Sequence, residues 1–239
     1  MKRLEGKVAI VTGSSSGIGK AIALKFAAEG ASVVVSARRS ELCDRVAAQI
    51  RERGGEAVAI PTDISDESQV ERLIAETHQR FGRLDILVNN AGGGGGERIV
   101  ETSTAEFDRV LNTNLRGTFF CCRAGFRQMM QNSGGTIINI SSVCGVDAWA
   151  GSGIYSASKY GIMGLTKALA DEGRQYNIKA CAICPGGVAS SLVDAPPEAI
   201  KRSQSISPFD IAEAAVYLAT LGPNAIVHQI IVERLWAEW

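Results

Sequence analysis

The sequence predicts an α/β fold, a doubly wound, mainly parallel seven-stranded sheet with helices on both faces. Short apolar segments alternate with longer segments of helical periodicity along the whole chain. The short segments are apolar throughout, which is typical of parallel strands that helices cover on both faces. A glycine-rich turn joins the first strand directly to the first helix. With 239 residues, 46% of them hydrophobic, we expect residues 1–239 to form one domain.

The expected elements alternate in order along the chain. The expected strands are residues 8–11, 32–36, 57–61, 84–88, 136–140, 179–183 and 228–232. The expected helices are residues 18–29, 41–53, 66–81, 104–131, 154–176 and 209–219. Right-handed crossovers between parallel strands place a ligand at the carboxyl ends of the strands.

The first turn has the composition of a phosphate-binding site. The apolar run Val8-Ala-Ile-Val11 leads into Thr12-Gly-Ser-Ser-Ser-Gly-Ile-Gly19, and a helical pattern follows. Glycines allow a tight turn and close backbone approach, and a helix N-terminus offers N–H groups and a positive dipole to a pyrophosphate. The sequence therefore predicts a dinucleotide-binding turn.

A second motif, Tyr155-Ser-Ala-Ser-Lys159, places a phenol and an ammonium on one face of a helix. A free phenol has a pKa of about 10 and is a poor base at neutral pH. A nearby cation lowers that pKa, and a shift of about three units requires roughly 4 kcal/mol. We expect Lys159 to lower the pKa of Tyr155.

These motifs resemble those of the short-chain dehydrogenase/reductase family over residues 4 to 231. The resemblance includes the first turn, Asn89-Asn-Ala-Gly92, Pro185-Gly186 and the motif from Tyr155 to Lys159, all in the family's order and spacing. It also includes Asp63, Asn114 and Ser142. The resemblance implies an NAD(P)-dependent oxidoreductase with a Rossmann-type fold, and it does not identify the substrate.

The resemblance also implies four catalytic residues. Tyr155 would exchange a proton with the substrate oxygen, Ser142 would hydrogen-bond that oxygen, and Lys159 would hold the nicotinamide ribose. Ser141 competes with Ser142, but the family's spacing to the tyrosine selects Ser142. Asn114 would position a water that links Lys159 to solvent, or it would be a helix-distorting polar residue bonded to backbone.

The expected cofactor site combines the first turn with the ends of later strands. The end of the second strand has Ala37 where NAD-preferring relatives have aspartate, and Arg38 can pair with a 2′-phosphate. We therefore expect NADP(H) in preference to NAD(H), unless Arg38 and Arg39 only solvate a loop. The predicted cofactor-binding residues are Gly13, Ser15, Ser16, Gly17, Ile18, Gly19, Arg38, Arg39, Asp63, Ile64, Asn90, Ala91, Gly92, Tyr155, Lys159, Pro185, Gly186, Val188 and Ser190.

Three other segments and Trp149 are further candidates for a role near the site or at a subunit interface. Residues 190–207 fall where relatives place a small substrate lid, and Trp149 could wall the pocket or cap the core. The five glycines of 92–96 form a flexible loop or a close approach to the cofactor. Trp236 and Trp239 in the C-terminal tail would dock on their own subunit or at a subunit interface.

Composition excludes several other classes of function. Acidic and basic residues are equal at 25 each, which gives no sign of nucleic-acid or membrane-surface binding. No apolar run approaches the ~18 residues of a membrane span, and the start leaves no room for a signal peptide. The six cysteines indicate reduced thiols in the cytoplasm, and Cys181 and Cys184 are expected to fill the core. We expect no metal site.

The partners expected are a small carbonyl or alcohol substrate and further copies of the chain. Two helical segments, 105–130 and 156–175, carry small or apolar residues on more than one face, which predicts a homotetramer or a homodimer. A catalytically silent dinucleotide-binding regulator is an alternative from another class. A dehydratase or epimerase of the same fold is the closer alternative.

Overall fold

The computed structural model describes residues 2–132, 134–196, 198–199 and 203–235. Within these residues, seven strands form one sheet in the order β3-β2-β1-β4-β5-β6-β7, and every neighbouring pair is parallel. This confirms the predicted fold class. The strands are β1 Val8–Thr12, β2 Ser32–Ser36, β3 Glu56–Ala59, β4 Ile86–Asn89, β5 Gly135–Ile140, β6 Ile178–Pro185 and β7 Gln229–Val232.

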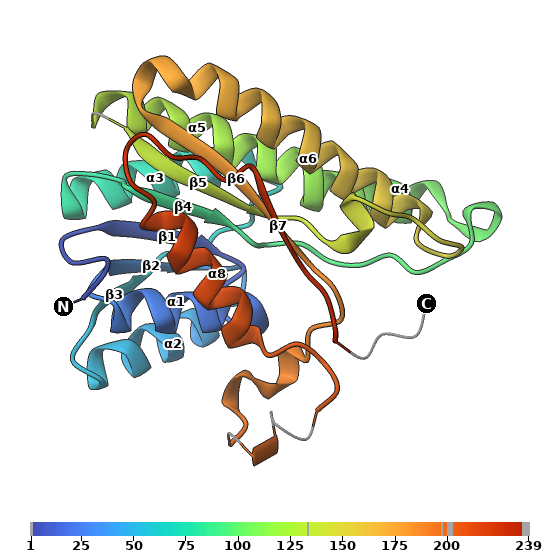
Figure 1. Cartoon of the computed structure of the whole chain (residues 1–239), viewed down its shortest axis with the longest axis horizontal. Coiled ribbons are helices and arrows are strands. Elements are labelled where there is room, and N and C mark those ends of the chain that lie inside the picture. The colour runs from blue at the N-terminus through green and yellow to red at the C-terminus, as the bar shows by residue number, and fades with distance from the viewer. Residues whose placement is uncertain (1, 133, 197, 200–202, 236–239) are drawn as a thin grey trace.

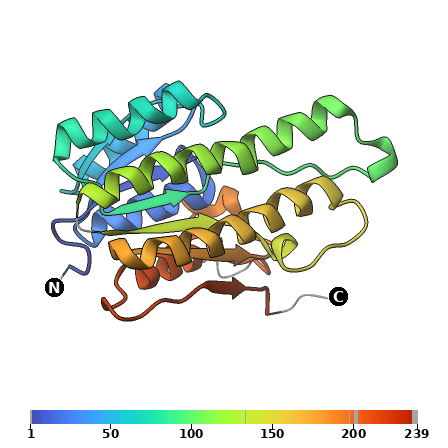
Figure 2. The same ribbon diagram turned by 90° about the horizontal axis from the view of Figure 1, so that it is seen from above.

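Helices cover both faces of the sheet (Figures 1 and 2). α1, α2 and α8 lie on one face, and α3, α5 and α6 lie on the other. The helices are α1 Gly17–Ala28, α2 Ser40–Glu52, α3 Glu67–Phe81, α4 Thr104–Leu111, α5 Thr118–Gln131, α6 Gly153–Glu172 and α8 Pro208–Ala219.

Two apolar clusters, one on each face, form the core. On β1 the side chains of Ala9 and Val11 belong to the cluster under α1, whereas Ile10 belongs to the cluster under α3 and α5. Successive strand residues point to opposite faces, so an apolar strand fills both clusters. The strand order reverses between β1 and β4, and this reversal opens a crevice at the carboxyl ends of the strands.

The predicted helical segment over residues 104–131 is helical throughout, but its middle part is not α-helical. α4 ends at Leu111, a π-helical segment spans Asn112–Gly117, and α5 begins at Thr118. The side chain of Asn114 bonds to another loop, and Gly117 packs so closely on Ile64 that a Cβ there would lie 2.8 Å from its side chain. A π-helical turn contains more residues than an α-helical turn, and these two contacts stabilise it here. The last part of predicted helix 154–176 is a 3₁₀ turn, Gly173–Tyr176.

Candidate active site

A groove follows the carboxyl ends of the strands. It consists of two adjoining cavities of about 630 and 360 Å³, which share Gly13, Ser16, Gly92 and Gly93 in their walls. The first cavity extends to Arg38, and we call this part the adenosine end. The second extends to Ser142, Tyr155 and Lys159, and we call this part the catalytic end.

The glycine-rich turn between β1 and α1 forms the middle of the groove. Gly13 has a φ of +64°, and a Cβ on it would lie 2.7 Å from the Cα of Ala91. The side-chain amide of Asn90 donates to the carbonyl oxygen of Thr12 at 3.0 Å, which fixes the turn to the loop after β4. Ser16 at the N-cap of α1 makes no side-chain capping bond. The first N–H groups of α1 therefore suit a pyrophosphate, which a dinucleotide would supply.

Two arginines and an aspartate lie at the adenosine end. The guanidinium of Arg39 donates to the hydroxyls of Ser15 at 3.1 Å and Ser16 at 3.2 Å. Arg38 also lines this cavity, and both arginines are exposed. The carboxylate of Asp63 accepts bonds from the backbone and hydroxyl of Ser65, so it shapes the turn after β3.

The catalytic end joins the last residues of β5 to the first turns of α6. Lys159 is 5% exposed, and its ammonium donates to the carbonyl oxygen of Ile140 at 2.9 Å. The same ammonium lies 5.6 Å from the centre of the Tyr155 ring. Ser142 Oγ accepts a bond from the backbone N–H of Cys144 at 3.1 Å and lies 3.4 Å from the carbonyl oxygen of Pro185.

Burial controls the ionisation of this pair. Burial raises the pKa of Tyr155 above its ordinary value, and the hydrogen bond with Ser142 opposes the rise. Burial lowers the pKa of Lys159 to about 8. The expected lowering of the tyrosine pKa by Lys159 is not what the structure gives, because desolvation of the phenol is the larger effect. A neutral phenol can donate a proton at neutral pH.

Asn114 lies behind the groove. Its amide nitrogen donates to the carbonyl oxygen of Gly93 at 2.9 Å and to Ser158 Oγ at 3.0 Å. Its amide oxygen accepts from the backbone N–H of Gly93 at 2.9 Å. Asn114 is thus a polar residue that bonds to backbone within a distorted part of its helix, which is one of the two roles expected of it. The hydroxyl of Ser158 bonds in turn to the carbonyl oxygen of Tyr155 at 2.7 Å, so Asn114 ties the glycine loop to α6.

Most of the predicted site residues are therefore brought together in one groove. Two are not part of its walls, since Asn114 lies behind Gly93, and Gly19 packs with its Cα against Gly13 and Asn90. The remaining predicted residues line one or both cavities: Gly13, Ser15, Ser16, Gly17, Ile18, Arg38, Arg39, Asp63, Ile64, Asn90, Ala91, Gly92, Ser142, Tyr155, Lys159, Pro185, Gly186, Val188 and Ser190.

Three polar or charged residues that line the adenosine end were not predicted from the sequence. Thr62, Arg109 and Thr113 face the adenosine end, and Arg109 bonds to the carbonyl oxygen of Gly94 at 3.1 Å. The position of Thr62 next to Asp63 was a usable signal. Nothing in the sequence marks Arg109 or Thr113, because the π-helical segment that turns Thr113 toward the groove depends on tertiary contacts.

The structure also shows the surroundings of Trp149, the glycine loop and two of the cysteines. The side chain of Trp149 is 53% exposed and does not cap the core. Within the glycine loop, Gly92 is packed against Asn114, whereas Gly94 and Gly96 have open space around them. Cys181 and Cys184 are buried and unpaired, as expected of core residues. Trp236 and Trp239 lie outside the described residues.

The residues that the structure describes contain no group of three or more His, Cys, Asp or Glu side chains arranged to hold a metal ion. No helix among them is both long and apolar enough to cross a bilayer.

The fold and groove define a dinucleotide-binding α/β protein, and comparisons with known proteins identify its family. The family model for short chain dehydrogenases matches residues 7–200. A 3β-hydroxysteroid dehydrogenase of Mediterraneibacter gnavus is 40% identical over 195 residues, which cover 81% of this chain and 70% of the relative. A 3-oxoacyl-[acyl-carrier-protein] reductase of Synechocystis is 39% identical over 195 residues, covering 81% and 79%.

Solved structures agree with these matches. A metagenomic short-chain oxidoreductase in complex with NADP has 34% sequence identity and a TM-score of 0.86, covering 98% of this chain and 100% of that chain. The chain belongs to the short-chain dehydrogenase/reductase family. It is an oxidoreductase of the NAD(P)-dependent type.

Proposed function

We propose that the chain interconverts a small ketone and the corresponding secondary alcohol, with NADP(H) as the preferred cofactor and Tyr155 as general acid/base. The observation that carries the proposal is the continuous groove. One end of it carries two arginines, and the other end holds Ser142, Tyr155 and Lys159.

The groove residues suit proton transfer to a reduced carbonyl. When bound, the reduced nicotinamide supplies the hydride. Ser142 already accepts a bond from Cys144, so its hydrogen is available, and its contact to Pro185 is long enough for a substrate oxygen to replace. A phenol is protonated at neutral pH, and burial raises the pKa of Tyr155 further, so its hydroxyl holds the proton that it can donate to the oxygen as negative charge develops there. Lys159 would hold the ribose hydroxyls, and Asn114 fixes the glycine loop beside it.

The preference for NADP(H) rests on charge at the adenosine end. Ala37 offers no carboxylate that would repel a 2′-phosphate, and Arg38 and Arg39 both line the cavity. Many NADP-preferring relatives have a basic residue in the glycine-rich turn, where this chain has Ser16. The guanidinium of Arg39 rests on the hydroxyl of Ser16 and brings positive charge to the same place. We therefore assign the phosphate contact to Arg39 together with Arg38.

Oxidation of NADPH and NADH in the presence of a panel of ketones tests the function. We expect turnover with at least one neutral ketone and a higher kcat/KM with NADPH. Binding of NADPH without turnover on any ketone or alcohol would favour the silent regulator instead.

The substrate side of the groove is bordered by a short segment, which we propose as a lid. In its described part, Asp194 pairs with Lys20 of α1 at 2.5 Å, and Val193 is buried. Val188 and Ile206 form a parallel bridge that closes the base of the segment. These contacts leave few residues for the lid, which favours a small substrate. We propose that the lid, near residues 190–207, belongs to one dinucleotide-binding and catalytic domain, residues 1–239.

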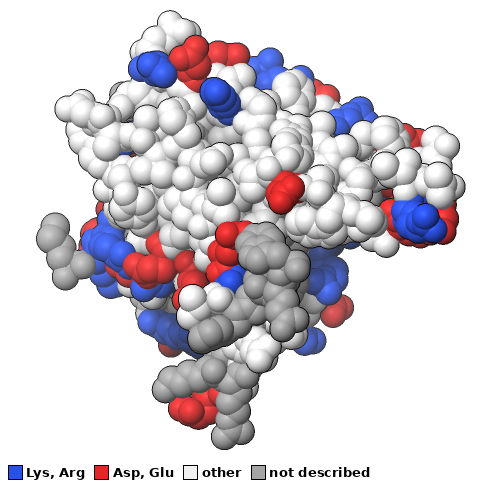
Figure 3. Space-filling model, turned by 45° about the vertical axis from the view of Figure 1, so that its right-hand side comes forward, with Lys and Arg blue, Asp and Glu red and all other residues white. Residues whose placement is uncertain are grey.

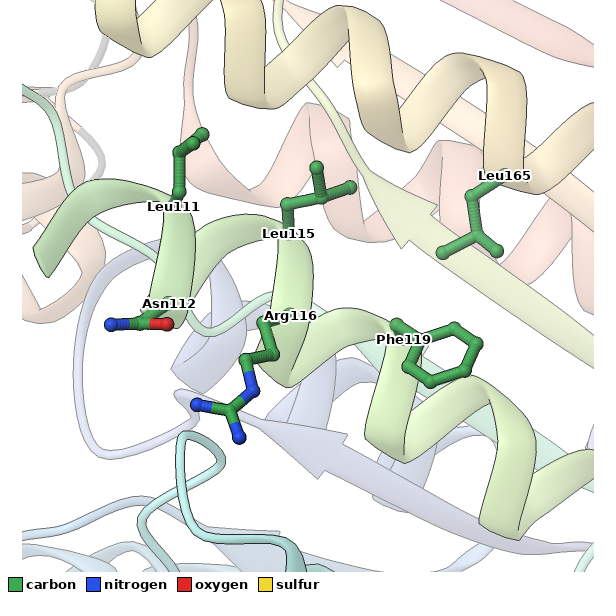
Figure 4. Close-up of a pocket in the computed structure, with 6 residues that line it drawn as sticks. All are labelled: Leu111, Asn112, Leu115, Arg116, Phe119 and Leu165. Carbon is green, nitrogen blue, oxygen red and sulfur yellow. The ribbon is translucent and has the colours of Figure 1, made fainter. Parts of the chain in front are cut away.

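We also propose that the chain assembles into a homotetramer. A hollow of about 330 Å³ lies between α6 and the π-helical segment with its flanking turns of α4 and α5, and it is lined mainly by apolar side chains, including Leu115, Phe119 and Leu165 (Figure 4). In this lining Phe119 is 41% exposed, and on α6 the small residues Ala157, Gly164 and Ala168 are exposed and leave the helix surface smooth. Such a face suits the same face of a second copy.

A second apolar surface lies on α8 and β7. Phe209, Tyr217 and Ile231 are between 37% and 50% exposed there. Few charged side chains cross the middle of the face shown in Figure 3. Two self-complementary surfaces close into a dihedral tetramer, so light scattering at micromolar concentration should give about four times the chain mass. A clean monomer would contradict this.

The buried, unpaired state of all six cysteines supports a reducing compartment, and we propose the cytoplasm. Fractionation of the native host, followed by detection of the protein, tests this location. Recovery outside the soluble cytoplasmic fraction would contradict it.

A further inference from the structure

Ser141 is a buried hydroxyl next to the groove that the reaction itself does not use. It is 3% exposed, and its Oγ donates to the carbonyl oxygen of Lys159 at 3.2 Å. We propose that Ser141 is a positioning residue, which fixes the backbone of Lys159 to the end of β5 and so sets the placement of Lys159 relative to Ser142. This inference rests on the proposed function.

Consecutive residues of one strand end hold Lys159 at two points. The carbonyl oxygen of Ile140 accepts from the ammonium at 2.9 Å, and the hydroxyl of Ser141 bonds to the main chain at 3.2 Å. Ser142 is the next residue along the chain. The backbone N–H of Ser141 donates to the carbonyl oxygen of Ile183 at 2.7 Å, which anchors this strand end in the sheet. The reacting groups of α6 and β5 are thus joined by a short, buried connection.

The turn after Ser142 closes over this connection. The N–H of Gly145 donates to the carbonyl oxygen of Ser142 at 2.8 Å. A Cβ on Gly145 would lie 2.4 Å from Ser141 Oγ and 3.0 Å from the carbonyl oxygen of Lys159. Only a glycine can approach the bond this closely, so the turn that orients Ser142 and the bond that orients Lys159 share one contact point.

A small displacement of the Lys159 backbone should affect proton transfer more than it affects cofactor binding. Proton transfer depends on groups held within a fraction of an ångström of their productive positions. The ammonium of Lys159 faces Tyr155, Cys144 and Cys184, and its environment changes if the backbone moves. Ser141 lines the catalytic end of the groove and is not among the residues that line the adenosine end.

The first test is Ser141→Ala. We expect kcat to fall about tenfold, in line with one lost hydrogen bond, while KM for NADPH changes less than about twofold. The pH midpoint of kcat/KM on the alkaline side should move by about half a unit or more. The matched control is Thr166→Val, which removes a buried hydroxyl of α6 that bonds to Ile162 and Asn139, away from the groove. It should lower the melting temperature and leave the pH midpoint of kcat/KM in place.

A double-mutant cycle with Gly145→Ala tests the contact without relying on turnover. The added methyl displaces the hydroxyl of Ser141, so Gly145→Ala alone should destabilise the protein and reduce kcat. In the Ser141→Ala background that oxygen is gone, and the additional loss should be smaller.

Each outcome decides a separate question. Additive unfolding free energies would refute the contact. Coupled free energies with an unchanged kcat and pH midpoint in Ser141→Ala would refute the positioning role. A wild-type protein that turns over no ketone or alcohol would refute the proposed function, and the stability cycle would still report on the contact.

Discussion

Arg38 and Arg39 lie exposed at the adenosine end of the groove, whereas Ser142 and Lys159 lie buried at the catalytic end. The arginines reach their positions on long side chains, and Arg39 is held there by hydroxyls of the glycine-rich turn. Lys159 is held by backbone groups of the neighbouring strand.

This difference reflects two physical tasks. A phosphate charge can be bound by flexible cations in water, where each contact contributes modestly. Proton transfer requires a group of defined ionisation in a fixed place, and burial provides both. We therefore expect substitutions at the catalytic end to act on kcat and those at the adenosine end to act on cofactor affinity.

The largest effect should come from Tyr155→Phe. The change removes the proton-transferring hydroxyl and keeps the ring, so kcat should fall by about a thousandfold or more while NADPH binding is nearly unchanged. Steady-state kinetics and fluorescence titration measure the two quantities. Tyr160→Phe, at an exposed position on the same helix, is the control and should keep full activity. Retention of more than about a tenth of the activity in Tyr155→Phe would remove Tyr155 as general acid/base.

At the other end, Arg38→Ala and Arg39→Ala should each raise KM for NADPH about ten- to a hundredfold, because one charge-assisted contact is lost. KM for NADH should change far less. Arg45→Ala on the exposed side of α2 serves as the control. Equal effects on both cofactors would show that neither arginine contacts the 2′-phosphate.

The buried ammonium should also be visible in the pH dependence of stability. The pKa of Lys159 lies at about 8 in the folded protein and near its ordinary, higher value when unfolded. Between these values the unfolded chain binds more protons, so this residue makes the unfolding free energy rise with pH, on the order of 1 kcal/mol between about pH 7.5 and 9.5. Lys159→Met should remove that increment relative to wild type.

Lys167→Met is the matched control, because Lys167 is exposed on the same helix. Urea unfolding at several pH values gives the comparison. If the unfolding free energy of wild type and of Lys159→Met changed equally with pH, burial would not lower the pKa of Lys159 in the folded protein.

The smallest effect should distinguish two positions of the glycine loop. A Cβ on Gly92 would lie 3.0 Å from the amide oxygen of Asn114 and 3.8 Å from the ammonium of Lys159, whereas one on Gly96 would meet nothing within 4 Å. Gly92→Ala should weaken NADPH binding a few-fold, about 1 kcal/mol, and Gly96→Ala should leave it unchanged. Calorimetric titration measures both, and equal weakening would indicate that the whole loop packs on the cofactor.

Much of the site followed from local patterns in the sequence. The apolar strands and the turn from Thr12 to Gly19 were predictable because buried parallel strands and phosphate-binding turns require particular residue types at fixed spacings. Tyr155 and Lys159 share a helix face whatever surrounds that helix. The family resemblance then added Ser142, Asn114 and the later cofactor residues, whose positions no local rule provides.

The tertiary structure decided how these residues meet. The π-helical segment at Asn114, the place of Arg39 on the turn and the bond from Ser141 to Lys159 join residues far apart in the chain. Whether Tyr155 gains or loses acidity depends on the balance between burial and nearby charge, which spacing alone does not specify. Sequence determines which groups lie on each element, and packing determines their distances, on which hydrogen bonds and pKa values depend.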